Sequence, residues 1–171
     1  MPARVDLSGV APESLTSWWL GWADDSTPVS VRLAEVSGVV VAGLAGFGKT
    51  MLVGHLLGQL APSPAVQFVL IDGKGGPDYD RLFPRAWLSA KDDLTDVRDV
   101  LRRVHRLMGD RQASIAQVLG VTDAWHPGPS PSWPLLVVVI DEAHTFFHER
   151  KGTSPEVKAH NALVAELSRL V

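Results

Sequence analysis

The stretch Gly43-Leu44-Ala45-Gly46-Phe47-Gly48-Lys49-Thr50 constrains the fold of this sequence more than any other. It matches G-x-x-x-x-G-K-[ST], the Walker A or P-loop pattern, at every fixed position. The β-branched run at residues 39–41 precedes it and predicts a strand, and apolar residues recur at helical spacing from residue 49 to residue 60. A strand, a glycine-rich loop and a helix in this order form the context in which the pattern binds phosphate.

The glycines of this loop allow the backbone to curl so that its N–H groups converge on an anion, and the following helix adds its positive N-terminal end. Lys49 is expected to reach the β- and γ-phosphates of a nucleotide and to act in catalysis. The Thr50 hydroxyl is expected to ligate Mg²⁺. The predicted nucleotide-binding residues are Gly43, Leu44, Ala45, Gly46, Phe47, Gly48, Lys49, Thr50 and Met51.

A second motif, Ile140-Asp141-Glu142, ends the fully apolar run at residues 135–140. Asp141 is expected to hold the Mg²⁺ shell, as in a Walker B motif, and Glu142 to activate the attacking water. The alternative is that the two acidic residues only cap the helix that follows them. A glutamate beside the aspartate favours a hydrolysing motor over a small-molecule kinase.

The remaining pattern predicts an α/β fold. Residues 18–33 read as a hairpin, residues 66–71 as a buried strand and residues 122–134, with four prolines, as a surface loop. Residues 135–140 resemble a strand buried on both faces of a parallel sheet, and residues 155–170 a final helix. Strands alternating with helices indicate a mostly parallel sheet flanked by helices, with ligands at the carboxyl ends of the strands.

A long amphipathic helix is predicted between these elements. Asp92 or Asp93 can cap its start, and Gly109-Asp110 is a point where it could be interrupted. Its expected buried stripe comprises Leu94, Val97, Leu101, Val104 and Met108.

Composition narrows the class of protein. The chain has 171 residues, 46% of them apolar and 20% charged, which fits one globular domain. A net charge of −3 gives no global basic field, so any contact with nucleic acid must be local. There is no cysteine, and residues 1–6 lead into no apolar run of the kind found in signal peptides, so we expect a cytoplasmic protein. The most apolar stretch, residues 39–60, contains Lys49 and His55 and predicts no membrane span.

Several segments resemble the FtsK/SpoIIIE family of DNA-translocating ATPases. Residues 70–76, LIDGKGG, are similar to the family's LIDPKGG segment, with Gly73 in place of proline. Residues 20–29 resemble the hairpin that precedes the family's P-loop, and an arginine-rich helix, a proline-rich loop and VVVIDE follow in the same order. Ala45 and Phe47 stand where the family commonly has threonine and serine. The resemblance covers residue 20 to the end of the chain.

This resemblance implies a RecA-like P-loop domain that hydrolyses Mg·ATP. It also implies a homo-oligomeric, hexameric ring that moves double-stranded DNA in chromosome segregation or plasmid transfer, tethered to a membrane only through partners or other segments. We expect one partial domain over residues 1–171, with a lead-in and hairpin at residues 1–37 and the nucleotide-binding core at residues 38–171. In the family a further strand, bearing a polar sensor, lies between the strands corresponding to residues 39–41 and 136–140, and an arginine that acts on a neighbour's ATP follows it. The resemblance places both after Val171, so we expect the 171 residues alone to be unstable.

Three other functions fit parts of the pattern. Type VII secretion ATPases share the fold family and act on proteins. A truncated nucleotide-binding module would bind ATP without turnover. Asp141-Glu142-Ala143-His144 also spells the DEAH motif of a helicase class, although that class has no LIDGKGG-like segment.

Four further features have a structural and a functional interpretation. His144 and His148 could ligate a metal if helical, but no third ligand is evident, and a structural role is favoured. Lys74 either approaches the site or serves only its loop. Three arginines at i,i+4 spacing on the long helix could follow the phosphate backbone of a nucleic acid, but the aspartates between them favour a salt-bridged face. The tryptophans could stack on adenine, but packing of the hairpin is favoured. These residues are Arg98, Arg102 and Arg106, and Trp18, Trp19 and Trp22.

Overall fold

The computed structural model describes residues 15–36 and 38–171, so the part of the expected lead-in at residues 1–14 lies outside it. The chain forms two compact units. The first comprises Met1–Gln67 and Val121–Leu136, and the second comprises Phe68–Gly120 and Val137–Val171. The first carries the P-loop motif and the second carries Asp141 and Glu142.

The expected hairpin is confirmed in the first unit. Strand β1 (Ser17–Trp22) pairs antiparallel with β2 (Pro28–Arg32), with a register shift between Trp19 and Gly21. The turn is held by the side chain of Asp25, whose Oδ1 accepts hydrogen bonds from the Thr27 N–H and hydroxyl. Aspartate closes such turns because its short side chain reaches the backbone two residues further on.

Helix α2 (Lys49–Leu60) begins directly after the P-loop, as predicted, and the hairpin packs against it. Gly48 precedes it in the left-handed region, at φ 78°. The Gln59 amide bonds both backbone groups of Trp19: Trp19 N–H donates to Oε1 at 3.2 Å, and Nε2 donates to the Trp19 carbonyl at 2.8 Å. The buried residues of α2 are Leu56, Leu57 and Leu60.

The strand predicted at residues 39–41 is not formed. This segment is irregular, and Val40 is 92% exposed. A β-branched run becomes a strand only where a neighbour satisfies its N–H and C=O groups. Within residues 15–36 and 38–171, no strand pairs with this segment. The expectation that a further strand separates it from residues 136–140 stays a prediction.

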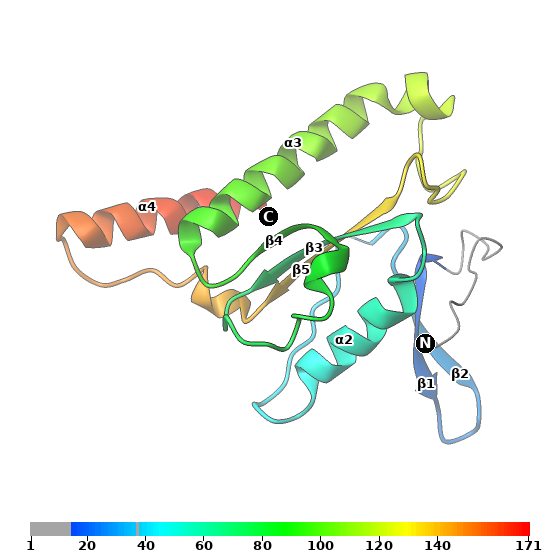
Figure 1. The fold of residues 1–171 in the computed structure, drawn as a ribbon, viewed down its shortest axis with the longest axis horizontal. Helices are drawn as coiled ribbons and strands as arrows, with labels where there is room; N and C mark the ends of the chain where they lie inside the picture. The colour runs from blue at the N-terminus through cyan, green and yellow to red at the C-terminus, as the bar shows by residue number, and fades with distance from the viewer. Residues whose placement is uncertain (1–14, 37) are drawn as a thin grey trace. The chain divides into compact units, whose positions relative to one another are not determined.

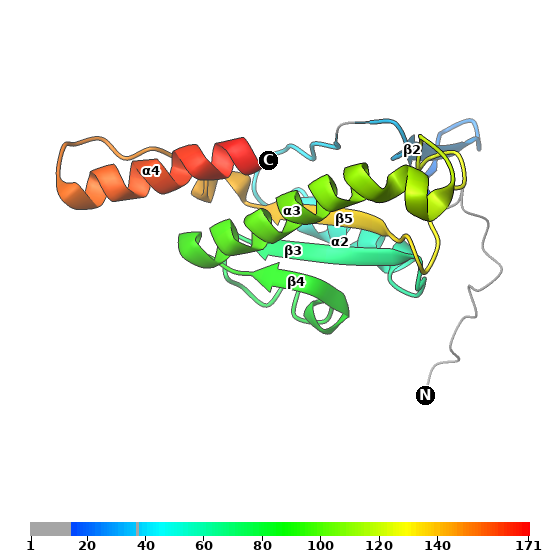
Figure 2. The same cartoon turned by 90° about the horizontal axis from the view of Figure 1, so that it is seen from above.

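A parallel sheet contains β4 (Ala86–Ala90), β3 (Val66–Asp72) and β5 (Leu135–Asp141) in that order (Figures 1 and 2). Strands β3 and β5 begin in the first unit and end in the second. The central strand β3 is buried almost throughout, as its apolar run predicts. We did not predict β4, because its alanines and serine carry little strand preference and its pairing with β3 is non-local.

Strand β5 differs from the prediction that it is buried on both faces. It is an edge strand of the three, its residues are only partly buried, and Val138 is 38% exposed. An all-apolar run predicts a strand, but it does not determine whether other elements cover both of its faces.

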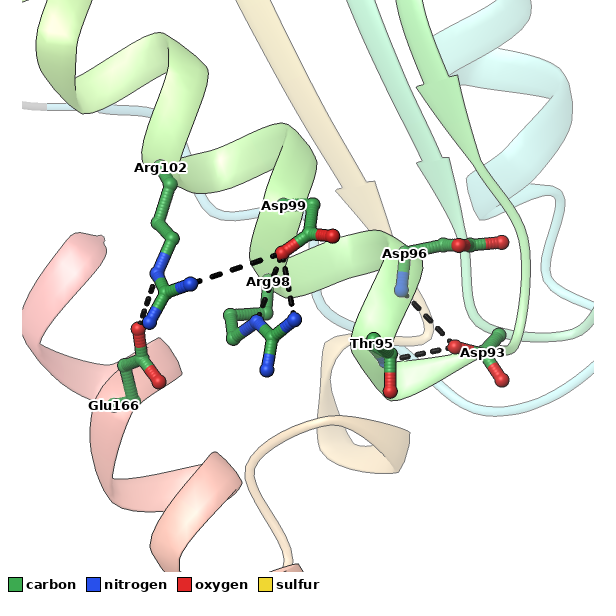
Figure 3. A network of polar contacts seen from close by, with 7 residues as sticks. All are labelled: Asp93, Thr95, Asp96, Arg98, Asp99, Arg102 and Glu166. Atoms are coloured by element: carbon green, nitrogen blue, oxygen red, sulfur yellow. Dashed lines mark hydrogen bonds and ion pairs between the residues drawn. The ribbon is translucent and has the colours of Figure 1, made fainter.

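Helix α3 (Leu94–Leu119) begins where predicted and ends at Gly120. The Asp93 carboxylate accepts hydrogen bonds from the N–H groups of Thr95 and Asp96, which caps the helix (Figure 3). The helix runs through Gly109-Asp110 without interruption, and Met108 is 51% exposed, so both of these expectations were wrong. Met108 lies beyond the buried residues, which are all in the first half of the helix, and a single glycine is tolerated inside a helix. The buried residues are Val97, Val100, Leu101 and Val104.

Helix α4 (Pro155–Leu170), capped by Ser154, lies beside α3 (Figures 1 and 2). Arg102 Nε bonds Glu166 Oε1 across the two helices at 2.6 Å, and Arg98 pairs with Asp99 (Figure 3). The predicted salt-bridged face is therefore confirmed for Arg98 and Arg102. Such partly exposed pairs contribute about 0–1 kcal/mol each, so they orient the helices more than they stabilise them. No helix in the described part of the chain is both long and apolar enough to cross a bilayer.

The loops that follow β3 and β5 meet at Gly73 in the second unit. The Gly73 N–H donates to the Asp141 carbonyl at 3.1 Å. A methyl group at Gly73 would lie 2.9 Å from the Glu142 carbonyl oxygen and 2.9 Å from the buried Phe146 ring. At Gly76, in the same loop, the nearest atoms would be 4.0 Å away. Close packing therefore requires a glycine at position 73 but not at position 76.

We predict that Gly73→Ala lowers the free energy of unfolding by about 1–3 kcal/mol, because the methyl group would displace backbone atoms. Gly76→Ala should be neutral or stabilise by about 0.4–1 kcal/mol, since it restricts only the unfolded chain. Urea unfolding of both variants measures the difference. Equal effects at the two positions would show that the two loops do not meet at Gly73.

A second prediction concerns the edge position of β5. Val69 in β3 is fully buried, whereas Val138 in β5 is 38% exposed. Val69→Thr should cost about 1–3 kcal/mol of unfolding free energy, because it buries a hydroxyl. Val138→Thr should change it by less than about 0.5 kcal/mol. Urea unfolding tests both, and a large loss at Val138 would mean that β5 is covered.

Candidate functional site

The P-loop in the first unit has the local geometry that its sequence predicts. Gly46 and Gly48 adopt φ values of 80° and 78°, which other residues rarely adopt. The Lys49 ammonium donates to the Leu44 carbonyl at 3.2 Å, so the lysine folds back over its own loop. An atom added at Gly43 would lie 3.8 Å from the Lys49 side chain. The loop, the lysine and the start of α2 therefore form one continuous cradle.

The donor set of this cradle fits a phosphate group. Lys49 already places its charge over the loop, and an anion would replace the Leu44 carbonyl as its partner. The groups that the segment offers an anion are backbone N–H groups, the Lys49 ammonium and the Thr50 hydroxyl, while its three large apolar side chains are largely exposed, at 74%, 78% and 80%. They belong to Leu44, Phe47 and Met51.

Asp141, at the end of β5 in the second unit, is held at three of its atoms. Oδ1 accepts from the Glu142 N–H at 2.9 Å, Oδ2 accepts from the Tyr79 hydroxyl at 3.0 Å, and the carbonyl accepts from Gly73. These contacts fix the orientation of the carboxylate that the sequence marks as a magnesium ligand.

Sequence reasoning missed Tyr79. Its side chain is 2% exposed, and burial raises the pKa of Tyr79 far above its ordinary value, with the charges of Asp141, Asp72 and Asp78 acting in the same direction. The phenol therefore remains a hydrogen-bond donor at neutral pH. It is the only tyrosine of the sequence, in the polar segment Gly75-Gly76-Pro77-Asp78-Tyr79, which is the one feature that could have drawn attention to it.

Glu142 has an unusual backbone. Its φ is 50° and its ψ is 44°, in the left-handed region that residues with side chains seldom adopt. Its carboxylate lies 3.3 Å from His144 Nδ1 and makes no capping bond to the short helix Ala143–Thr145. The alternative that this glutamate only caps the next helix is therefore not supported. Strained residues of this kind concentrate at functional sites.

Asp72, at the end of β3, is a buried acidic residue at this edge, whereas Asp141 is only partly buried. Asp72 is 2% exposed, and its Oδ1 accepts from the Lys74 N–H at 3.0 Å. Its Oδ2 has no hydrogen-bond partner among the described residues. The Lys74 ammonium pairs instead with Asp78 at 3.3 Å, which favours a loop role for Lys74.

The histidines and tryptophans with a predicted structural role make contacts within the protein. His148 offers its carbonyl to His160 Nε2 at 3.0 Å, and no group of three or more acidic, histidine or cysteine side chains among the described residues could hold a metal. The structural role of His144 and His148 stays a prediction. Trp18 is buried, and Trp19 packs edge to face with Trp22.

The position of Trp19 bears on the adenine hypothesis. It is bonded to Gln59, ten residues after Lys49, which is about 15 Å along the helix axis. This end of α2 lies away from the phosphate loop. The contacts favour packing of the hairpin on the helix over stacking on a nucleotide base.

Comparisons with known proteins support the fold. No protein-family model matches this sequence, and no curated protein sequence matches it. Among solved structures, the pCW3 conjugation coupling protein TcpA, determined in a monomer form with ATPγS, is similar with a TM-score of 0.67 and 15% sequence identity. The likeness covers 91% of this chain and 43% of that one, so this chain spans less than half of its length. It shows that the chain has the α/β fold, with a parallel sheet flanked by helices, that the sequence predicts.

Proposed function

We propose that this chain is the ATP-binding and ATP-hydrolysing part of a motor. The observation that carries the proposal is the phosphate cradle of the first unit. There, two glycines in left-handed conformation and the folded-back Lys49 lie at the start of α2, whose N-terminal end favours an anion. The solved structure with a similar fold was determined with an ATP analogue, which supports the same ligand.

Each predicted residue then has a role in hydrolysis. Lys49 would exchange the Leu44 carbonyl for phosphate oxygens, while Gly43–Met51 supply backbone N–H groups. Thr50 and Asp141 would hold Mg²⁺, which neutralises the charge that develops on the phosphate oxygens. Glu142 would accept a proton from the attacking water. Tyr79, which donates to Asp141 Oδ2, would keep that carboxylate oriented for the metal.

The proposed cargo is double-stranded DNA, moved by a homo-oligomeric ring in chromosome segregation or plasmid transfer. Two features support it: the FtsK/SpoIIIE-like segments of the sequence, and a fold similar to that of a conjugation coupling protein. Arg98 and Arg102 of α3 are unsuited to this contact, because both already pair with acidic side chains. Contacts with DNA would therefore come from other, local groups.

We predict that Lys49→Ala weakens ATP binding by at least about 10-fold, because it removes charge-assisted hydrogen bonds to phosphate. Lys74→Ala is the matched control and should bind normally. Glu142→Gln should retain binding and lose about 10²- to 10⁴-fold in turnover, whereas the exposed control Glu149→Gln should not. Binding is measured by titration of a fluorescent ATP analogue and turnover by phosphate release. Turnover at the parent rate in Glu142→Gln would exclude this residue as the base, and binding with no turnover in the parent would favour a non-hydrolysing module.

A further prediction concerns the cargo. Filter binding with duplex DNA should show an affinity that falls as salt is raised, because binding displaces counterions from the phosphate backbone. The slope of the logarithm of the affinity against the logarithm of the salt concentration should be modest, since a chain of net charge −3 offers few local contacts to DNA. Absence of duplex binding at low salt, in a form that hydrolyses ATP, would point to a protein cargo.

A further inference from the structure

The carboxylate of Asp72 is an exception among the buried polar groups of the second unit. Buried polar atoms in proteins almost always have hydrogen-bond partners. Oδ1 of Asp72 has one in the Lys74 N–H, but Oδ2 has none among the described residues, although the residue is 2% exposed. None of the ion pairs in the described part of the chain includes Asp72.

An unpartnered carboxylate oxygen in this position destabilises the folded protein. Taking a charged group out of water is unfavourable unless hydrogen bonds or an opposite charge replace the lost hydration. An uncharged residue of similar shape at this position would cost less free energy to bury. Functional sites commonly contain polar groups that lack hydrogen-bond or charge partners until a ligand binds.

The surroundings of Asp72 indicate what the missing partner is. Asp72 ends β3, and the next residue, Gly73, donates to the Asp141 carbonyl at the end of β5. Tyr79 is close enough to feel the charges of both aspartates, and its hydroxyl bonds Asp141. The ends of β3 and β5 thus bring two aspartates to one edge of the sheet, and the charges of both act on the phenol of Tyr79. That arrangement favours a cation or a donor held by a cation, because carboxylates left side by side repel each other.

The group that fits is a water molecule bound to Mg²⁺. Magnesium is held by one or two carboxylates and keeps several of its waters, which donate strong hydrogen bonds to nearby oxygens. Outer-shell acceptors of this kind orient the ligands of the metal. We propose that Asp72 is a positioning residue for the hydrated Mg²⁺ that Asp141 would hold, with its Oδ2 accepting a hydrogen bond from a metal-bound water. This inference rests on the proposed function, with Asp141 as the direct ligand.

Asp72→Asn tests the inference, with Asp78→Asn as the matched control. Both change aspartate to asparagine, one at the end of β3 and one in the loop that follows it, but Asp78 is exposed and paired with Lys74. The first measurement is thermal unfolding without nucleotide or metal. Asp72→Asn should raise the melting temperature by about 2–4 °C, because a neutral amide is buried more easily than an unpartnered carboxylate. Asp78→Asn should leave it unchanged or lower it slightly.

The second measurement is the affinity for fluorescent ATPγS with and without Mg²⁺. Asp72→Asn should reduce the gain in affinity that Mg²⁺ provides by about 10-fold, as expected for an outer-shell partner, and leave the metal-free affinity unchanged. Asp78→Asn should preserve that gain.

The outcomes separate the inference from the proposed function. If Asp72→Asn raises stability but keeps the full Mg²⁺ effect, Asp72 is only an unfavourable buried group, and the inference is wrong. If Asp72→Asn destabilises the metal-free protein, Oδ2 already has a partner, and the inference is wrong as well. If the unsubstituted protein binds no ATPγS, the proposed function fails, and this inference falls with it.

Discussion

The hydrogen bond between the Gly73 N–H and the Asp141 carbonyl joins the ends of two parallel strands, and the polar edge of the sheet is arranged around it. It requires a residue without a side chain, because the Glu142 carbonyl and the Phe146 ring occupy the space where a methyl group would lie. With the strand ends fixed in this way, Tyr79 from the same loop reaches Asp141 Oδ2. One backbone contact thus brings together an aspartate that is marked by its motif and a tyrosine that is not.

Features that depend on local chemistry could be predicted from the sequence. Helices α2 and α4 begin and end at the expected residues, because Gly48, Pro155 and Ser154 are start signals that act within one turn. The conformation of the P-loop is equally local, since Gly46 and Gly48 need no distant partner to adopt positive φ. The likeness to a solved structure confirms the class of fold that these elements imply.

Features that depend on distant partners could not be predicted. Residues 39–41 have the composition of a strand, but pairing decides whether a strand forms. Strand β4 shows the opposite case, because its pairing with β3 makes a strand of a segment with weak preference. The orphaned oxygen of Asp72 and the buried hydroxyl of Tyr79 are visible only once the loops are packed, since the LIDGKGG segment gives Asp72 no stated role and Tyr79 belongs to no motif.

The two hydrogen bonds between Gln59 and Trp19 have a mechanical consequence. Helix α2 is a stiff rod whose first residue, Lys49, belongs to the phosphate loop and whose last turn contacts the hairpin. Because the Gln59 amide bonds both the N–H and the carbonyl of Trp19, the strand can neither slide nor rotate on the helix without breaking one of them. A shift of the loop when its anion arrives or leaves would therefore move the hairpin as well, about 15 Å away along the helix. The first unit would then act as a lever between the P-loop at one end and an exposed pair of tryptophan rings, Trp19 and Trp22, at the other.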